Sequence, residues 1–336
     1  MRTPFVVLSF LCATANIAHA ILQQSAPPPW AFGFTAPPPP GAAAPSPAPV
    51  QRAVTPPRAR VDTVKRTLAG SALSFTAAEI RDANAPADWF PGDHPPMPPI
   101  VARGRVEANV SACGLCHYPN GKGRPENSGV AGLPESYVLQ TFNDFRSGAR
   151  HSSDPRKANT NNMIGFAKAM TDDEMKAVAE YFSSMKWTPW IRVVETDSVP
   201  KTRIATGMFI PLDGAPAGKE AIGSRIIEVP ENVEETETLR NPRSGFIAYV
   251  PKGAVKKGAE LAARAQCVLC HGAALTGLGP VPGIAGRSPS YMARQLYDIQ
   301  HGARKGLWSE LMKGVVGPLS NEDMLNLAAY VASRTP

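Results

Sequence analysis

Cysteine is scarce in this chain, which contains only five among its 336 residues. Four of them form two short patterns, Cys113 with Cys116 and Cys267 with Cys270, while the fifth, Cys12, lies in an apolar leader. No pair is left for a structural disulfide, and no spare thiol is left as a nucleophile or an extra ligand. The sequence therefore excludes a disulfide-stabilised scaffold and catalysis by a free cysteine.

Long apolar runs are also missing. Beyond the leader, no segment approaches the length that spans a bilayer, so we expect no transmembrane segment in the mature chain. The sequence shows no nucleic-acid-binding motif, and its formal net charge of +7 alone is a poor indication of that partner. A basic surface favours acidic docking partners and fast, salt-sensitive encounters. We therefore expect protein partners with acidic docking surfaces and no nucleic acid.

Two pentapeptides carry the chemistry: CGLCH at Cys113–His117 and CVLCH at Cys267–His271. The spacing C-x-x-C-H is typical of covalent attachment of c-type haem. Two thiols three residues apart reach the vinyl groups along one side of a porphyrin, and the adjacent histidine becomes the proximal iron ligand. Zinc binding or dithiol redox chemistry is the alternative, but two matches inside one repeat favour haem. We predict two covalent haem c groups held by the four cysteines, with His117 and His271 as iron ligands.

The two motifs belong to a long internal repeat. A shift of 154 residues matches the chain to itself without a gap from Val101 to Arg150, and the register recovers at a shift of 149, where Met163 meets Met312. Self-similarity at this period indicates two copies of one domain. Each copy has roughly 85–90 residues, enough for only a small core. A haem would supply most of the apolar interior.

Each copy is predicted to be all-α. Helices are expected ahead of the motifs, over 101–112 and 255–266, with Gly104 and Gly258 at matching places. A glycine inside a helix costs about 1 kcal/mol relative to alanine. Both glycines are therefore expected to allow close crossing with the last helix of their domain.

The final helix of each copy is predicted to begin with a capping box, Thr171 with Glu174 and Ser320 with Asp323. Apolar residues follow at helical spacing in both copies and are assigned to the core.

These residues resemble the class I cytochromes c, specifically the tandem diheme kind of which cytochrome c4 is the type. The resemblance covers about 101–186 and 252–334, and rests on the haem motifs, the P-x-x-x-G-x-x-x-x-Y run from Pro282 to Tyr291, the G-A-R triplets and a methionine before the last helix. It implies a mainly α fold of two tandem class I cytochrome c domains. We expect a short β-rich insert between them and a disordered Pro-rich N-terminal tail.

In that family a methionine is the distal iron ligand, opposite the histidine. Met163 and Met312 are the repeat-matched pair, each seven residues before the apolar residue that enters the last helix. Met175 and Met324 also match each other, but on the buried stripe of the final helix, where methionine is ordinarily core filler. The resemblance therefore assigns Met163 and Met312 as metal ligands. The remaining histidines are expected at the surface: His94, His151 and His301.

Pro282 resembles the family proline whose backbone carbonyl holds the proximal histidine ring. Its counterpart in the first copy is Ser128, so the orientation of His117 stays open. Arg150 and Arg304 are candidates for haem propionate binding, because arginine suits carboxylates, although solvated helix ends are an equal alternative.

The N-terminal leader MRTPFVVLSFLCATANIAHA has an early arginine, a short apolar stretch and a small-x-small ending, which predict a signal peptide cleaved after Ala20. Export fits the chemistry, because c-type haem is attached outside the cytoplasm, and we expect a periplasmic protein. The following segment is rich in proline and alanine, and is predicted to be an extended spacer or docking arm.

Between the copies, three short runs rich in β-forming residues fit no cytochrome pattern and predict a few strands. The Pro- and Trp-rich stretch ahead of the first copy predicts an ordered strap on that domain. The predicted division is signal peptide 1–20, disordered linker 21–60, strap 61–99, first cytochrome c domain 100–189, β-rich segment 190–251 and second cytochrome c domain 252–336.

Iron held by histidine and methionine has no open position, which suits electron transfer and not substrate binding. We therefore predict a carrier, with no catalytic residue, between a dehydrogenase or quinol-oxidising complex and a terminal acceptor (an oxidase or reductase). The alternatives are a peroxidase-like diheme enzyme and a cytochrome subunit docked to a periplasmic dehydrogenase. Ser128 in place of a proline, and a longer polar loop before Met163, predict that the two haems differ.

Overall fold

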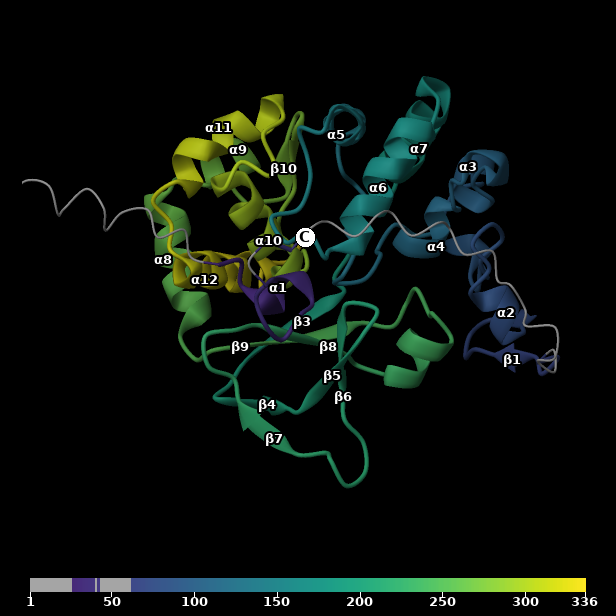
Figure 1. Cartoon of the computed structure of the whole chain (residues 1–336), viewed down its shortest axis with the longest axis horizontal. Coiled ribbons are helices and arrows are strands. Elements are labelled where there is room, and N and C mark those ends of the chain that lie inside the picture. The colour runs from purple at the N-terminus through teal and green to yellow at the C-terminus, as the bar shows by residue number, and fades with distance from the viewer. Residues whose placement is uncertain (1–25, 40, 43–61) are drawn as a thin grey trace, which may run out of the picture.

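The computed structural model describes residues 26–39, 41–42 and 62–336. The predicted signal peptide, Cys12 and much of the predicted linker lie outside the described residues. Two helical domains lie side by side, and a layer of strands covers one side of the pair (Figure 1). Within the described residues, no helix has the length and apolar character needed to cross a membrane.

The first domain packs α5 against α6 and α7 around a core of aromatic and aliphatic side chains. The predicted capping box at Thr171 and Glu174 forms at the start of α7, since each residue's side chain accepts from the other's backbone N–H. The helices of this domain are α3 Pro99–Ala102, η2 Val106–Ala108, α4 Cys113–His117, α5 Glu135–Ser147, α6 Ala158–Ala169 and α7 Asp172–Ser183.

The predicted helix over 101–112 is wrong. The chain leaves α3 at Gly104, which has φ of +64°, and returns through an antiparallel bridge between Arg105 and Val110. A Cβ atom at Gly104 would lie 2.2 Å from the carbonyl oxygen of Val110, so only glycine fits this tight turn.

The second domain is the more regular of the two, and its predicted first helix is present as α8. Gly258 lies where α8 crosses α12, and a Cβ atom there would lie 2.0 Å from the carbonyl oxygen of Asn326. The predicted close crossing is therefore found in this domain. Its elements are α8 Ala254–Arg264, α9 Val268–His271, β10 Gly277–Leu278, β11 Val281–Pro282, α10 Pro289–Gln300, α11 Leu307–Val316 and α12 Asn321–Ala332.

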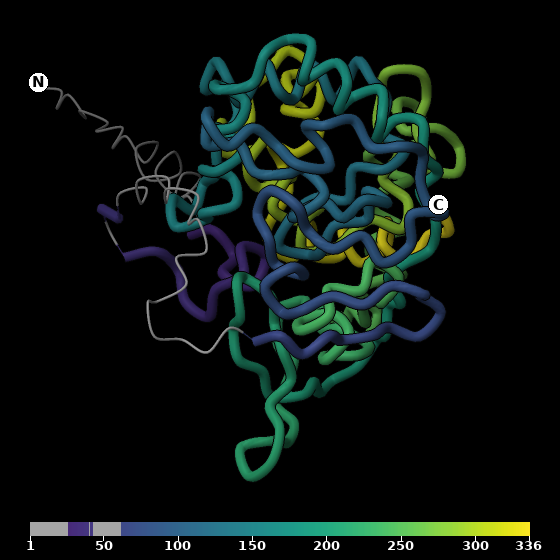
Figure 2. The backbone as a smooth tube through the Cα atoms, turned by 90° about the vertical axis from the view of Figure 1, so that its right-hand side faces the viewer, coloured from purple at the N-terminus to yellow at the C-terminus, as the bar shows by residue number. Residues whose placement is uncertain are grey.

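The segment between the domains forms a three-stranded sheet in the order β3-β9-β8, with β3 parallel and β8 antiparallel to β9. Its strand residues Ile227, Val229 and Val250 are buried in the same core as α10 and α12. Two separate antiparallel pairs lie beside it: the hairpin β5–β6, and β4 with β7, which enclose that hairpin in the chain. The loop between β6 and β7 projects away from the rest (Figures 1 and 2). The bounds are β3 Ile191–Glu195, β4 Ser198–Pro200, β5 Thr202–Ala205, β6 Met208–Pro211, β7 Lys219–Ala221, β8 Ile227–Pro230, a π-helical turn Glu234–Thr238 and β9 Phe246–Val250.

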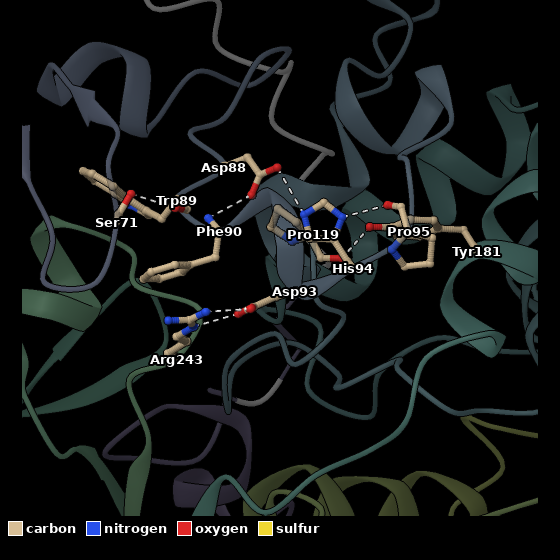
Figure 3. Close-up of polar contacts among 10 residues, drawn as sticks. All are labelled: Ser71, Asp88, Trp89, Phe90, Asp93, His94, Pro95, Pro119, Tyr181 and Arg243. Atoms are coloured by element: carbon tan, nitrogen blue, oxygen red, sulfur yellow. Dashed lines mark hydrogen bonds and ion pairs between the residues drawn. The ribbon is translucent and has the colours of Figure 1, made fainter.

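The strap ahead of the first domain packs against both that domain and the insert (Figure 3). Its small core joins Trp89 and Phe90 to Leu239 of the insert, and the Trp89 indole N–H donates to the carbonyl of Leu239 at 2.7 Å. Asp93 accepts two hydrogen bonds from the Arg243 guanidinium, at 2.7 and 2.6 Å. The strap elements are β1 Arg66–Thr67, β2 Ser74–Phe75, α2 Ala77–Ile80 and the 3₁₀ turn η1 Pro91–Asp93.

His94 in this strap is not at the surface as predicted. Its side chain is 4% exposed, with Nε2 at 3.1 Å from an Asp88 carboxylate oxygen and Nδ1 at 2.8 Å from the carbonyl of Pro95 (Figure 3). The ring stands edge-on to Tyr181 of α7, at a centroid distance of 6.2 Å. The paired carboxylate explains how the imidazole is buried, since it satisfies the ring nitrogen.

The predicted disorder over 21–60 is wrong for the described part of that segment. Residues Pro29–Phe32 form the short helix α1, in which Trp30 and Phe32 are buried against the second domain. Phe32 stands edge-on to Tyr297 of α10, and the Arg294 guanidinium donates to the carbonyl of Ala31. Proline and alanine dominate the composition here, but two aromatic side chains bury enough apolar area to dock the segment.

Candidate haem-binding sites

In the first domain, one cavity brings together all four predicted attachment and ligand residues. Cys113, Cys116 and His117 come from α4, and Met163 comes from α6. The surface of the cavity is otherwise mainly apolar, and its lining includes six aromatic rings: Tyr137, Phe142, Phe145, Phe166, Phe182 and Tyr291.

The second domain repeats this arrangement. Cys267, Cys270 and His271 line a cavity together with Met312, which lies in α11. Its apolar lining includes Met292, Leu296, Ile299, Leu327 and Val331. A mainly apolar cavity with two thiols, an imidazole and a thioether suits a haem c, because these are the groups that attach and ligate it.

The histidine of each motif, predicted as a proximal ligand, is oriented by a backbone carbonyl. The Nδ1 atom of His117 lies 2.8 Å from the carbonyl oxygen of Ser128, and that of His271 lies 2.9 Å from the carbonyl oxygen of Pro282. A carbonyl only accepts, so each ring carries its proton on Nδ1 and leaves Nε2 free for iron. Serine thus makes the contact that the sequence left open.

Burial lowers the pKa of His117 and of His271, while the hydrogen bonds to Ser128 and Pro282 oppose this shift. Both imidazoles are therefore held neutral near pH 7, which is the form that binds a metal. Within the described residues, no group of three or more His, Cys, Asp or Glu side chains is arranged to hold a metal ion.

The predicted propionate partners Arg150 and Arg304 line the first and second cavity respectively, but each also binds the opposite domain. Arg150 donates to the Tyr291 hydroxyl at 3.1 Å, and Arg304 donates to the Tyr137 hydroxyl at 2.8 Å. Both guanidinium groups also donate to the side-chain amide oxygen Oε1 of Gln295, at 2.7 and 3.0 Å. Equivalent residues of the two domains thus make reciprocal contacts, as expected for two copies related by a pseudo-two-fold axis.

Sequence reasoning missed Gln295 and the roles of Tyr137 and Tyr291. The two tyrosines are a repeat-matched pair, so their match was a usable signal, although nothing local shows that each one serves the other domain. Burial raises the pKa of Tyr291, but the charges of Arg150 and Arg304 outweigh it and bring that pKa to about 8.

The backbone strengthens this junction between the domains. The G-A-R triplets run antiparallel, with Lys305 N–H donating to the Ala149 carbonyl and His151 N–H to the Ala303 carbonyl, both at 2.8 Å. Buried Arg287 donates to the carbonyls of Gly129 and Ala131, at 2.8 and 3.0 Å. These contacts join the two domains, so that the two cavities lie side by side.

The two attachment motifs differ in exposure. In the second domain Val268 is 47% and Leu269 is 66% exposed. In the first domain the matching Gly114 is buried and Leu115 is half-buried, and the Arg240 side chain of the insert donates to the Leu115 carbonyl. The insert therefore covers one motif and leaves the other open.

The predicted polar loop before Met163 is partly helical, because α6 begins at Ala158. Its first half packs onto other parts of the molecule: Ser153 N–H donates to an Asp298 carboxylate oxygen at 2.9 Å, and Arg156 donates to the Ala36 carbonyl at 2.8 Å. The first cavity is thus covered differently from the second.

Comparison with known proteins matches residues 101–186 and 255–335 to the family described as Cytochrome c. A thiosulfate dehydrogenase electron acceptor of Stutzerimonas stutzeri (strain A1501) is 25% identical over 237 residues, covering 70% of this chain and 84% of that protein. Cytochrome c4 of Azotobacter vinelandii is 24% identical over 231 residues, covering 67% and 85%.

Among solved structures, reduced recombinant cytochrome c4 from Pseudomonas stutzeri has a TM-score of 0.43 at 21% identity, covering 68% of this chain and 96% of that one. A thiosulfate dehydrogenase from Marichromatium purpuratum has a TM-score of 0.44 at 23% identity. The match covers 69% of this chain and 38% of the thiosulfate dehydrogenase chain.

Each matched segment contains one attachment motif and one of the two cavities. The chain belongs to the cytochrome c family, with two such domains in tandem. It is a diheme, cytochrome c4-like electron-transfer protein with two covalently attached haem c groups, as the resemblance implied.

Proposed function

We propose that this chain carries single electrons in the periplasm between a dehydrogenase or quinol-oxidising complex and a terminal acceptor. The observation that carries the proposal is the paired cavity, in which a histidine and a methionine from different helices both face the space between them. Haem supplies the one-electron redox chemistry. The chain orients each imidazole, excludes water with apolar side chains and fills the distal position.

The metal ligands in this proposal are His117 with Met163 and His271 with Met312. Cys113, Cys116, Cys267 and Cys270 form the covalent attachments. Ser128 and Pro282 orient the imidazoles through their carbonyls, and Arg150 and Arg304 stand beside the propionates. The mature chain begins near Ile21. Because it carries two covalent haems, its intact mass should exceed that of the polypeptide from Ile21 by two haems.

The second domain offers the better surface for a redox partner. Five large apolar side chains are exposed on the attachment motif and the elements around it: Val268, Leu269, Leu278, Leu307 and Leu311. Exposed Arg264, Lys305 and Lys313 lie on the same domain. An apolar patch with positive neighbours fits a partner whose own apolar patch is rimmed by carboxylates. A dehydrogenase is favoured, since one relative is named for accepting electrons from thiosulfate dehydrogenase.

Stopped-flow reduction of the oxidised holoprotein by a purified periplasmic thiosulfate dehydrogenase, with thiosulfate as its substrate, tests this proposal. The rate should fall with rising salt and drop about tenfold in Leu307→Asp, because a carboxylate on the patch repels the acidic partner. Val64→Asp is the matched control, since Val64 is 66% exposed on the strap and Leu307 is 73% exposed. Equal reduction rates in Leu307→Asp and Val64→Asp would contradict the proposal that the partner docks on this face.

A peroxidase-like enzyme is the competing function, and it requires an iron with an accessible distal position. Carbon monoxide binding to the reduced protein separates the two. A carrier with both methionines in place leaves the spectrum unchanged, whereas a peroxidase-like site binds the gas at one haem.

A further inference from the structure

A third cavity, of about 480 Å³, lies outside the two haem sites. Its walls come from four separate parts of the chain: the segment containing α1, the strap, the first domain and the insert. It adjoins the first haem cavity, because Cys116, Glu126, Asn127, Lys157 and Asn159 line both.

The lining of this cavity is strongly cationic. Five basic side chains and a single acidic one line it: Arg81, Arg124, Arg156, Lys157 and Arg240, with Glu126. Arg124 pairs with Glu126 at 2.6 Å, and Arg156 pairs with Asp154 at 2.7 Å. Within the described part of the chain, the other three basic groups have no carboxylate within ion-pair distance. The cavity therefore has an excess of positive charge.

Several of these groups are buried as well as unbalanced. Lys157 is 4% and Arg240 is 9% exposed, and both belong to the three basic groups without a carboxylate partner among the described residues. Arg124, which is 7% exposed, pairs with Glu126, but its Nε has no hydrogen-bond partner. Burial, followed by the neighbouring charge of Arg294, holds the pKa of Lys157 well below its usual range. Buried cations without a counter-charge are costly, and a buried donor without a partner calls for a ligand.

We propose that this cavity binds a small, multiply charged oxyanion beside the first haem. The arginine guanidinium groups present planar pairs of N–H donors, which match the oxygens of such an anion, and the Lys157 amine adds a further donor whose protonated form a bound anion favours. Phe32 and Phe34 of the N-terminal segment form the apolar part of the wall. The site thus depends on the docking of that segment.

The position of the site predicts an effect on only one haem. Cys116 lines the cavity, so a bound anion lies next to the covalent attachment of the first haem. Negative charge close to a haem stabilises the oxidised form over the reduced form. Anion binding should therefore lower the midpoint potential of the first haem and leave the second unchanged.

Calorimetric titration of the diheme holoprotein with sodium sulfate and with inorganic phosphate, at ionic strength held constant with sodium chloride, tests the proposal. We expect saturable binding of one anion per chain. Arg124→Gln and Lys157→Gln should each weaken it at least tenfold. Arg192→Gln is the control, because Arg192 is an exposed arginine of β3 outside the cavity, and it should bind as the wild type does.

Each variant is accepted only with an unchanged haem spectrum and two haems by mass. If Lys157→Gln loses haem, Arg156→Gln replaces it as the test variant. The Arg156 side chain is 27% exposed and does not line the first haem cavity, so its replacement should leave the haem in place. Absence of saturable binding in the wild type overturns the proposal, and shows that the haem propionates or water satisfy the cluster. Binding that is equal in the cavity variants and the control, or that shifts both haem potentials alike, overturns it too.

Discussion

Ser128 and Pro282 differ in their side chains but present the same backbone carbonyl to a proximal histidine. The contact is therefore a property of where the backbone runs and not of the residue type. Arg150 and Arg304 are the same residue type at equivalent positions of the repeat, yet each donates to a tyrosine of the opposite domain. A residue's role here depends on what the fold brings to it.

Replacing the distal methionines tests the ligand set at this scale. Met163→Ala and Met312→Ala should each remove half of the weak sulfur-to-iron absorption of the oxidised protein at the red edge of the visible range, because each removes one thioether. Met175→Ala is the control, since Met175 is buried in the core of the first domain. An unchanged spectrum for Met312→Ala would show that another group ligates the second iron.

At the scale of secondary-structure elements, the two copies diverge ahead of the haem motif. The second copy keeps the long helix α8, whereas the first has only the short α3 and a glycine turn. The strap and the insert occupy the flank of the first domain, where Ala112 N–H donates to the Ala83 carbonyl at 2.8 Å. In the first domain the helix is shorter, and the strap provides a hydrogen-bond acceptor for the backbone that follows it.

The α8–α12 crossing should be sensitive to one methyl group. Gly258→Ala places a Cβ atom 2.0 Å from the Asn326 carbonyl, so the helices must separate, and we expect a loss of about 1–3 kcal/mol of unfolding free energy. Gly314→Ala, in α11 with no atom within 4 Å of its new Cβ, should instead gain up to about 1 kcal/mol. Denaturant unfolding of both holoproteins measures the difference. Equal stability of the two variants would contradict the packing argument.

The packing of the strap against the first domain should be more stable at low pH than at high pH. Burial opposes protonation of His94, but the Asp88 carboxylate and the Pro95 carbonyl outweigh it and raise the pKa of His94. A raised folded-state pKa means that this contribution is complete below the unfolded value of about 6.5 and is lost as pH rises through the folded-state pKa. Hydrogen exchange over residues 88–97, corrected for intrinsic rates, should show more protection at pH 6 than at pH 8.5.

Asp88→Asn is the matched control for this pH effect, because it removes the charge and keeps the side-chain shape. The variant should lose the difference in protection between the two pH values. A difference of the same size in the variant would assign the effect to another group.

At the scale of the whole molecule, the two haem sites are joined by backbone and side-chain hydrogen bonds but surrounded differently. The strap and Arg240 of the insert cover the side of the first attachment motif, and the N-terminal segment, which packs on the second domain, lines the cavity beside it. The attachment motif of the second domain faces outward. Burial and local charge are among the factors that set a haem potential.

A redox titration of the holoprotein should therefore require two one-electron components with separate midpoints. Ser128→Pro serves as the companion variant, because it makes the first site resemble the second while the carbonyl contact to His117 stays. A single midpoint that fits both haems, in the wild type and in Ser128→Pro alike, would contradict the expected difference.

The two covalent haems and the two-domain repeat could be predicted from the sequence, and the same motifs predict which cysteines and histidines hold each haem. Each depends on the spacing of neighbouring residues or on matching one copy to the other, as at Cys113–His117 and Cys267–His271. The class of protein followed from the same residues. The β-rich runs were also visible, because alternation and composition are local.

Only the tertiary structure decided the rest. The burial of Trp30 and Phe32, the Arg150–Tyr291 and Arg304–Tyr137 pairs and the cationic cavity join residues that are far apart in the chain. The helix expected over 101–112 failed because the Gly104 turn closes against Val110 and the strap takes the place beside it. Sequence spacing determines which chemistry a segment can perform, whereas the surroundings of each haem arise from contacts between distant segments.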